Sequence, residues 1–201
     1  MRLWKICRAL WNPVRFALLR DISTSPRHAL NVVQAADRSG RKKSVTSQYL
    51  KQLADAGLLA VERRGSYAIC ASDRLCRSPL ARLQKALADF FAENPGGDKD
   101  KDALKPIKAL SHHGRIAIVR KVAEREGGIP FGELAQSTSF PPATLFRQLG
   151  MLVDAGIVKS GKGPDGKHAY SLVPQPDGLR FALVSLACDN RLDQNSQSFK
   201  L

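Results

Sequence analysis

Residues 44–59 read SVTSQYLKQLADAGLL, and residues 143–158 read ATLFRQLGMLVDAGIV. Aligned at an offset of 99, both segments keep two leucines three residues apart, followed by the triplet Asp-Ala-Gly. Leucines at this spacing lie on one face of a helix, and the glycine ends it because glycine adopts a left-handed backbone at little cost. The two segments therefore predict two copies of one helix, each ending at a turn.

The similarity continues upstream of both helices. Residues 5–20 (KICRALWNPVRFALLR) align with residues 105–120 (KPIKALSHHGRIAIVR) at an offset of 100, with six identities. Tyr67 and Tyr170 give a third match at an offset of 103, which predicts about four extra residues before the second tyrosine. Matches in the same order along the chain predict an internal duplication.

The segment between the copies is ENPGGDKDKD, residues 93–102. It combines helix breakers with alternating charge and has no apolar residue, which predicts an exposed linker. The expected organisation is a first domain over 1–93, a linker over 94–102, a second domain over 103–188 and a flexible tail over 189–201.

Each copy has the same predicted elements. In the second copy the pattern predicts helices over about 103–110, 112–126 and 131–137, a turn, and the leucine-bearing helix that ends at Gly156, in which Phe146 is expected to widen the apolar stripe. β-rich segments around a Gly/Pro/Asp cluster (157–160 and 167–173) predict a hairpin. A closing helix follows, over 79–92 in the first copy and over 177–188 in the second. We expect the closing helices to pack as a pseudo-twofold pair; alternatively, the Leu80–Phe91 stripe pairs between chains.

This order of elements, with YLKQLADAGLL and RQLGMLVDAGIV each followed by a basic hairpin, resembles the winged helix-turn-helix of ArsR-type transcriptional regulators. The resemblance covers residues 5–71 and 105–173. It implies tandem winged helix-turn-helix domains, a mainly α fold with small β-hairpin wings (α+β), a recognition helix in the major groove, and a dimer built from the terminal helices. The metal ligands of that family do not carry over, since FGELAQ (131–136) has no cysteine, and no metal or cofactor is expected.

Charge and composition narrow the class of protein. The 201 residues include 32 Lys plus Arg against 18 Asp plus Glu, a net charge of +14, which attracts polyanions and nucleic acid first. No stretch approaches the ~20 apolar residues of a membrane span, Lys5 and Arg8 interrupt any signal peptide, and the four cysteines form no CxxC pattern. These features predict a cytoplasmic protein that does not bind membranes. No nucleotide-binding or hydrolase motif is present, so no enzyme is expected.

Candidate DNA contacts follow from the helix faces. In the first copy the cations at the helix start oppose the helix dipole, a cost that an anionic partner explains. The candidates there are Arg41, Lys42, Lys43, Ser44, Ser47, Gln48 and Lys51 on the helix, and Arg63 and Arg64 on the wing. Those of the second copy are Ser139, Thr144, Arg147 and Gln148 on the helix, and Lys159, Lys162, Lys167 and His168 on the wing.

Two conspicuous groups have competing interpretations. The repeated arginines, Arg15/Arg115 and Arg20/Arg120, either clamp phosphates or form structural contacts that cover the core. Adjacent histidines, His112 and His113, point in different directions on a helix, which favours capping or solvent exposure over chelation.

The sequence thus predicts sequence-specific binding of double-stranded DNA by a transcriptional regulator, acting as a single-chain pseudo-dimer or as a dimer through the closing helices. A replication initiator of plasmids or mobile elements is the alternative within the same class. A winged-helix protein-interaction module is the alternative from another class, which the charge of +14 disfavours.

Overall fold

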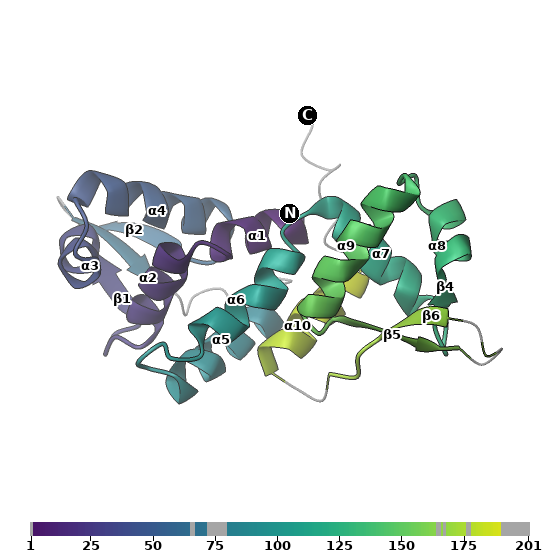
Figure 1. Ribbon diagram of the computed structural model, residues 1–201. Helices are drawn as coiled ribbons and strands as arrows, with labels where there is room; N and C mark the ends of the chain where they lie inside the picture. Colours follow the sequence, from purple (N-terminus) through teal and green to yellow (C-terminus); the bar gives the residue numbers. More distant parts are fainter. Residues whose placement is uncertain are drawn as a thin grey trace.

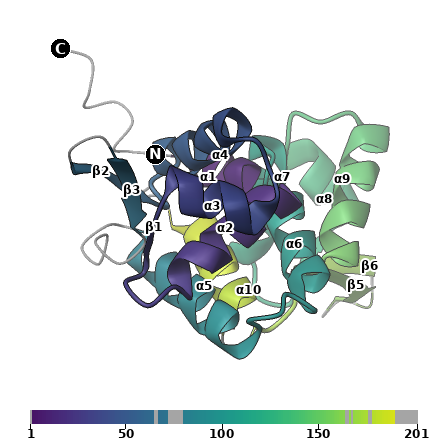
Figure 2. The same ribbon diagram turned by 90° about the vertical axis from the view of Figure 1, so that its left-hand side faces the viewer.

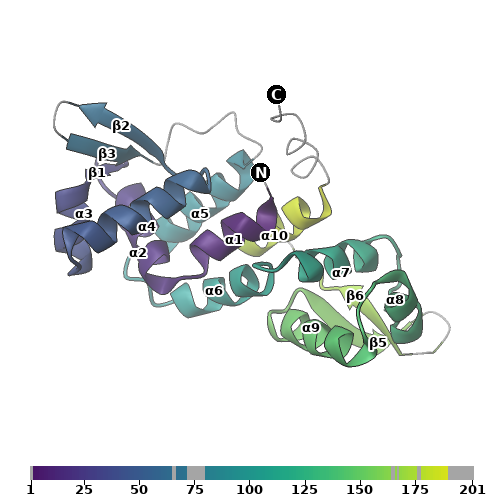
Figure 3. The same cartoon turned by 90° about the horizontal axis from the view of Figure 1, so that it is seen from above.

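The computed structural model describes residues 2–64, 67–71, 80–163, 166, 168–175 and 178–189, with the backbone alone at 63–64 and 67–71. The described chain is mostly helical, with two small antiparallel sheets near opposite ends of the molecule (Figures 1 and 3). This is the mainly α, α+β architecture that the sequence predicts.

The two copies have the same order of elements. The described elements of the first copy are α1 (Leu3–Leu10), α2 (Pro13–Ser23), β1 (Ala29–Asn31), α3 (Val32–Ser39), α4 (Lys43–Asp55), β2 (Ala60–Arg64), β3 (Tyr67–Ala71) and α5 (Ala81–Glu93). Those of the second copy are α6 (Asp100–Ala109), α7 (His113–Ala123), β4 (Ile129–Pro130), α8 (Phe131–Ser137), α9 (Pro142–Asp154), β5 (Val158–Lys162), β6 (His168–Leu172) and α10 (Gly178–Cys188). Helices α4 and α9 have 13 residues each and begin 99 residues apart, so the duplication is confirmed at the level of structure.

Each sheet has a third strand that the sequence does not predict. In both sheets the second hairpin strand is central, with the orders β1-β3-β2 and β4-β6-β5. Leu30 lies opposite Cys70 in the first sheet, and Ile129 lies opposite Tyr170 in the second. Because Leu30 and Ile129 are equivalent at the offset of 99, Tyr170 is the counterpart of Cys70. The expected match of Tyr170 with Tyr67 is therefore wrong. Between Gly156 and Tyr170 the second copy has one residue more than the first copy has between Gly57 and Cys70, not the four that were expected.

The copies pack through equivalent helices. Helix α5 lies against α10, and α1 lies against α6, so each helix of these pairs meets its own counterpart (Figure 3). Elements related by a twofold axis meet in this way. One continuous core crosses the contact, with Phe16, Leu83 and Phe91 of the first copy and Leu183 of the second almost fully buried in it.

This packing confirms the expected pairing of the closing helices within one chain. Leu83, Leu87 and Phe91, which form the apolar stripe of α5, are buried inside the molecule. The alternative, in which that stripe pairs between chains, is wrong because the face is already covered.

The linker is shorter and more ordered than expected. Residues 100–102 belong to α6, which leaves 94–99 between the copies. Asn94 is buried; its Oδ1 accepts from the backbone N–H of Lys99 at 3.3 Å, and its Nδ2 donates to Asp100 at 3.2 Å. Arg20 donates to Asp100 at 2.5 Å and lies so close to Gly97 that a Cβ at that position would overlap the guanidinium. The linker is thus an ordered turn, and Pro95, Gly96, Asp98 and Lys99 are exposed as predicted.

Among the helices of the described ranges, none has both the length and the apolar character that crossing a bilayer requires.

Candidate nucleic-acid interface

Helices α3 and α4 are joined by a tight turn at the outer end of the first copy (Figures 2 and 3). Gly40 ends α3 with a left-handed φ of 62°, and the backbone N–H of Arg41 returns to the carbonyl of Ala36 at 3.2 Å. A residue with a Cβ is strained in this conformation, which explains the glycine. The turn therefore sets the direction of α4 through this backbone hydrogen bond, together with one from Oγ of Ser39 to the same carbonyl at 3.2 Å.

Helix α4 has one buried face and one polar face. Thr46, Leu50 and Leu53 are buried, which fixes the rotation of the helix about its axis. The opposite face carries the exposed residues predicted to contact DNA: Lys43, Ser44, Ser47, Gln48 and Lys51. The structure therefore brings these side chains together on one accessible surface, and Arg41 and Lys42 are exposed at its start.

The N-terminus of α4 concentrates positive charge. Lys42 occupies the N-cap and makes no capping hydrogen bond through its side chain, and the first turn has no acidic residue. The free N–H groups of a helix N-terminus and the positive end of its dipole attract anions. Three cations, Arg41, Lys42 and Lys43, stand at this end instead of the usual carboxylate or hydroxyl cap. The arrangement suits a phosphate group.

The hairpin of the first copy pairs β2 with β3, and Arg64 lies opposite Tyr67 at its tip. The side chains of the predicted contacts Arg63 and Arg64 lie outside the described residues. Val61 is half exposed on the same strand.

The equivalent helix of the second copy, α9, differs in character. On α9 Arg147 is exposed and Thr144 is half-buried, and Ser139 is exposed in the turn before the helix, so these three stay predicted DNA contacts. Gln148 is only 7% exposed, so its prediction as a DNA contact is wrong. The prediction for Phe146 is wrong in the opposite sense, because this side chain does not widen the buried stripe and is 67% exposed.

Gln148 is buried because it binds a repeated arginine. Arg115 donates to Oε1 of Gln148 and to the carbonyl oxygens of Lys108 and Ala109. In the first copy Arg15 makes the same set of bonds, to the carbonyl oxygens of Arg8 and Ala9 and to Oε1 of Gln52. The structural interpretation of this arginine pair is therefore correct, and the phosphate clamp is not.

The glutamine that binds this arginine has changed position between the copies. Gln52 aligns with Met151, and Gln148 aligns with Tyr49, one helical turn earlier. The sulfur of Met151 lies 3.5 Å from Nη1 of Arg115. In the first copy, the centroid of the Tyr49 ring lies 5.9 Å from Cζ of Arg15. In each copy the arginine thus contacts one glutamine amide and one other side chain, a methionine sulfur or a tyrosine ring, but the two positions are swapped between the copies. Sequence alignment alone does not show this, because neither glutamine aligns with the other.

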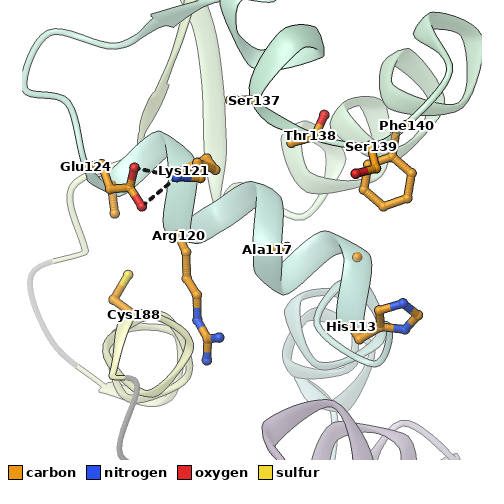
Figure 4. Close-up of a pocket in the computed structure, with 12 residues that line it drawn as sticks. His113, Ala117, Arg120, Lys121, Glu124, Ser137, Thr138, Ser139, Phe140 and Cys188 are labelled. Atoms are coloured by element: carbon orange, nitrogen blue, oxygen red, sulfur yellow. Dashed lines mark hydrogen bonds and ion pairs between the residues drawn. The ribbon is translucent and has the colours of Figure 1, made fainter. Parts of the chain in front are cut away.

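The other repeated pair is structural as well. Arg20 binds Asp100, as described above, and Nε of Arg120 donates to the carbonyl of Ala187 at 2.7 Å. Arg120 borders a cavity of about 660 Å³ between α7, the α8–α9 turn and the end of α10, and points toward α10 (Figure 4). On its wall Lys121 pairs with Glu124 at 2.9 Å, and burial raises the pKa of the Cys188 thiol while Arg120 opposes that shift. The cations of this cavity are engaged within the protein.

His112 confirms the capping interpretation, whereas the expectation that the two adjacent histidines point in different directions is wrong, because their rings stack with 4.6 Å between centroids. Nδ1 of His112 accepts the backbone N–H of Gly114 at 3.1 Å and so caps α7, as Asn12 caps α2 in the first copy. Burial, followed by the charges of His113 and Arg115, lowers the pKa of His112. The ring of His113 contacts Trp4 edge-on with 6.4 Å between centroids, which links the two copies.

The hairpin of the second copy presents an accessible basic edge. Lys159, Lys162 and His168 are exposed, and Lys162 lies opposite His168 in the strand register. Directly opposite residues share one face of a sheet, so these two side chains lie together near the tip of the hairpin. Lys167, the remaining prediction here, lies outside the described residues.

Within the described ranges no three His, Cys, Asp or Glu side chains cluster as a metal site would require. The chain matches no model of a known protein family and no curated protein.

Proposed function

We propose that this protein binds double-stranded DNA, with α4 as the recognition helix in the major groove and the adjacent β2–β3 hairpin at the sugar–phosphate backbone. In this proposal each copy is a winged helix-turn-helix unit. The order of elements supports it, because two helices joined by a short turn are followed by an antiparallel hairpin in both copies.

The observation that carries the proposal is the exposed face of α4. Gln48 offers an amide that pairs in bidentate fashion with adenine, and Lys51 offers a cation for a neighbouring phosphate. Ser44 and Ser47 have short hydroxyl side chains that let the helix approach base edges closely. The uncapped, cation-rich start of the helix fits a phosphate that holds α4 in register. Base-reading groups and a phosphate site on one helix are what sequence-specific recognition needs.

The second copy contributes differently in this proposal. The exposed face of α9 offers Arg147 but no counterpart of Gln48 or Lys51, whose aligned positions are Arg147 and Gly150. Lys159, Lys162 and His168 on its hairpin suit phosphate contacts, which position the protein without reading sequence. The chain then acts as an asymmetric pseudo-dimer, and a transcriptional regulator is the role we assign to it.

Selection of bound duplexes from a random pool tests the proposal, followed by affinity measurements over a range of salt concentrations. We expect the double variant K43A/K51A to lose affinity and to reduce the slope of log K against log salt by about 2, one for each phosphate-neutralising lysine. Lys105→Ala is the matched control, because this exposed lysine on α6 pairs with Asp102 and lies outside the proposed interface. Equal losses in K43A, K51A and K105A variants, or negligible binding to duplex DNA at low salt, would rule the proposal out.

A further inference from the structure

Helix α9 carries an apolar stripe on its outer face. Ala143, Phe146, Gly150 and Val153 are all exposed, with 67% of Phe146 and 37% of Val153 accessible to solvent. Their spacing of three and four residues is the a/d spacing of a helix that packs against another helix. The core-facing residues of α9 lie on the other side. The stripe is therefore separate from the surface that holds α9 in the fold.

The fold itself does not require an apolar surface at these positions. The equivalent residues of α4 are Ser44, Ser47, Lys51 and Ala54, of which the first three are polar and exposed. The same helix, in the same place in the other copy, is thus stable with a polar face. An exposed aromatic side chain within an apolar stripe marks an interaction surface.

Gly150 points to a close-packed helical partner. It lies in the interior of α9, where glycine weakens a helix relative to alanine. A Cβ at this position would meet no atom of the chain within 4 Å, so nothing inside the molecule excludes a larger residue. Glycine at the middle of the stripe instead leaves a recess beside Phe146, the largest side chain of the stripe.

We propose that the stripe binds α9 of a second copy of this chain, with the two helices antiparallel about a twofold axis at the level of residue 148. In antiparallel helix pairs, a positions face d positions. The pairing places Phe146 against Gly150 of the partner subunit and Ala143 against the partner's Val153. A large residue meets a small one in every layer, so the stripe is complementary to itself.

The charges beside the stripe select the same arrangement. Arg147 and Asp154 are exposed along one edge of it, seven residues apart. In the antiparallel pair Arg147 faces the partner's Asp154, and symmetry repeats this contact. A parallel pair would place Phe146 against the partner's Phe146 and Gly150 against the partner's Gly150, and would put Arg147 and the partner's Asp154 on opposite sides of the seam. Both apolar size and charge therefore favour the antiparallel dimer.

The expected dimer is weak and reversible. One pair of 13-residue helices forms an interface at the small end of specific contacts. We expect a dissociation constant of about 1–100 µM, which corresponds to transient association. Sedimentation velocity of the full chain without DNA, over a concentration series that spans this range, measures it directly.

Four variants test the arrangement. Phe146→Glu is expected to raise the dissociation constant by about 30-fold or more, as loss of a central aromatic anchor does. Gly150→Leu is expected to do the same by filling the recess, whereas the monomer accepts it because the site is open. Arg147→Asp is expected to weaken the dimer through repulsion with the partner's Asp154, and the double variant R147D/D154R is expected to restore it.

Phe181→Glu is the matched control, because Phe181 is also an exposed phenylalanine, on α10 and away from the stripe. Circular dichroism confirms that each variant is folded. A wild-type chain that stays monomeric throughout the concentration series overturns the proposal. Equal loss of association in F146E and F181E, or failure of the charge reversal to restore it, also overturns it.

A further outcome would reassign the stripe. If Phe146→Glu abolishes duplex binding while the wild-type protein remains monomeric, α9 contacts DNA and the self-association proposal is wrong. Because sedimentation is measured without nucleic acid, failure of this proposal is distinguishable from failure of the proposed DNA binding.

Discussion

Nη1 of Arg115 donates a hydrogen bond of 2.8 Å to Oε1 of Gln148, and both side chains are buried. The same guanidinium binds the carbonyl oxygen of Lys108 at 3.1 Å. Burial lowers the pKa of Arg115 because desolvation disfavours the charged form. The hydrogen bonds offset that cost, and they join the end of α6 to both α7 and α9.

Replacing Gln148 by Leu should therefore destabilise the fold. The substitution leaves a buried guanidinium N–H without its acceptor, which costs about 1–3 kcal/mol of unfolding free energy. Urea denaturation measures the loss. Arg147→Ala, one residue earlier and exposed, should change stability by less than about 0.5 kcal/mol. If the Q148L variant had the same unfolding free energy as the wild type, the hydrogen bond between Arg115 and Gln148 would contribute nothing to stability.

Phe91 tests whether the two copies share one core. Its ring lies 5.1 Å from that of Phe16, centroid to centroid, and is fully buried on α5, the helix that packs against α10. Phe91→Ala should reduce stability by about 3–5 kcal/mol through loss of buried surface and the cavity left behind. Because the core is continuous, we expect calorimetry to show one transition that moves as a whole.

Phe181→Ala provides the comparison, since Phe181 is substantially exposed and should cost far less. Two separate transitions, of which only one shifts in F91A, would contradict a shared core.

The cap at His112 predicts a pH dependence of stability. The folded pKa of His112 lies below its ordinary value, so the unfolded chain binds the proton more readily than the folded chain. The contribution of His112 to the unfolding free energy is fully present above the pKa of the unfolded chain, about 6.5. This contribution is lost as the pH falls from that value through the lower pKa of the folded chain. The loss is limited to the worth of one helix cap, about 1 kcal/mol.

His112→Asn isolates this effect, because the first copy uses Asn12 at the equivalent position and asparagine does not titrate. Thermal denaturation between about pH 5 and 7.5 should show a shallower decline in H112N than in the wild type. Parallel curves for the two proteins would exclude the cap as the titrating group.

Gln48 and Lys51 should affect DNA binding in different ways. Gln48→Ala should lower affinity for the selected site by about 1–3 kcal/mol and relax the base preference at one position, without changing the salt slope. Lys51→Ala removes a phosphate contact and should weaken binding to all sequences alike, with the salt slope reduced by about 1. Fluorescence anisotropy with selected and scrambled duplexes separates the two patterns. An unchanged base preference in the Q48A variant would remove Gln48 from the reading face.

The helices were predictable because each carries a local signal. Leucine spacing gave α4 and α9 their extent and their buried sides, and Gly57 and Gly156 marked their ends, both with positive φ. The exposed face of α4 followed directly from the buried positions of Leu50 and Leu53. These inferences need only the period of the helix and no knowledge of its neighbours.

The remaining features depend on tertiary contacts. Gln148 resembles a polar surface residue until Arg115 is placed beside it, and Phe146 resembles a core residue until the rotation of α9 is fixed. The strands β1 and β4 are three and two residues long, too short to show an alternating pattern. The match of Tyr67 with Tyr170 failed because equivalent strand positions are defined by the residues they pair with. Identity of two residues in the sequence does not show which strand positions are paired.

Covalent fusion of the two copies has a genetic consequence. In a homodimer, one altered codon changes both subunits, so equivalent surfaces of the two subunits cannot differ. Here a codon for α4 leaves α9 untouched, and the polar Ser47 and the aromatic Phe146 occupy equivalent places. Each half is therefore free to mutate toward its own task while the shared core keeps both folded.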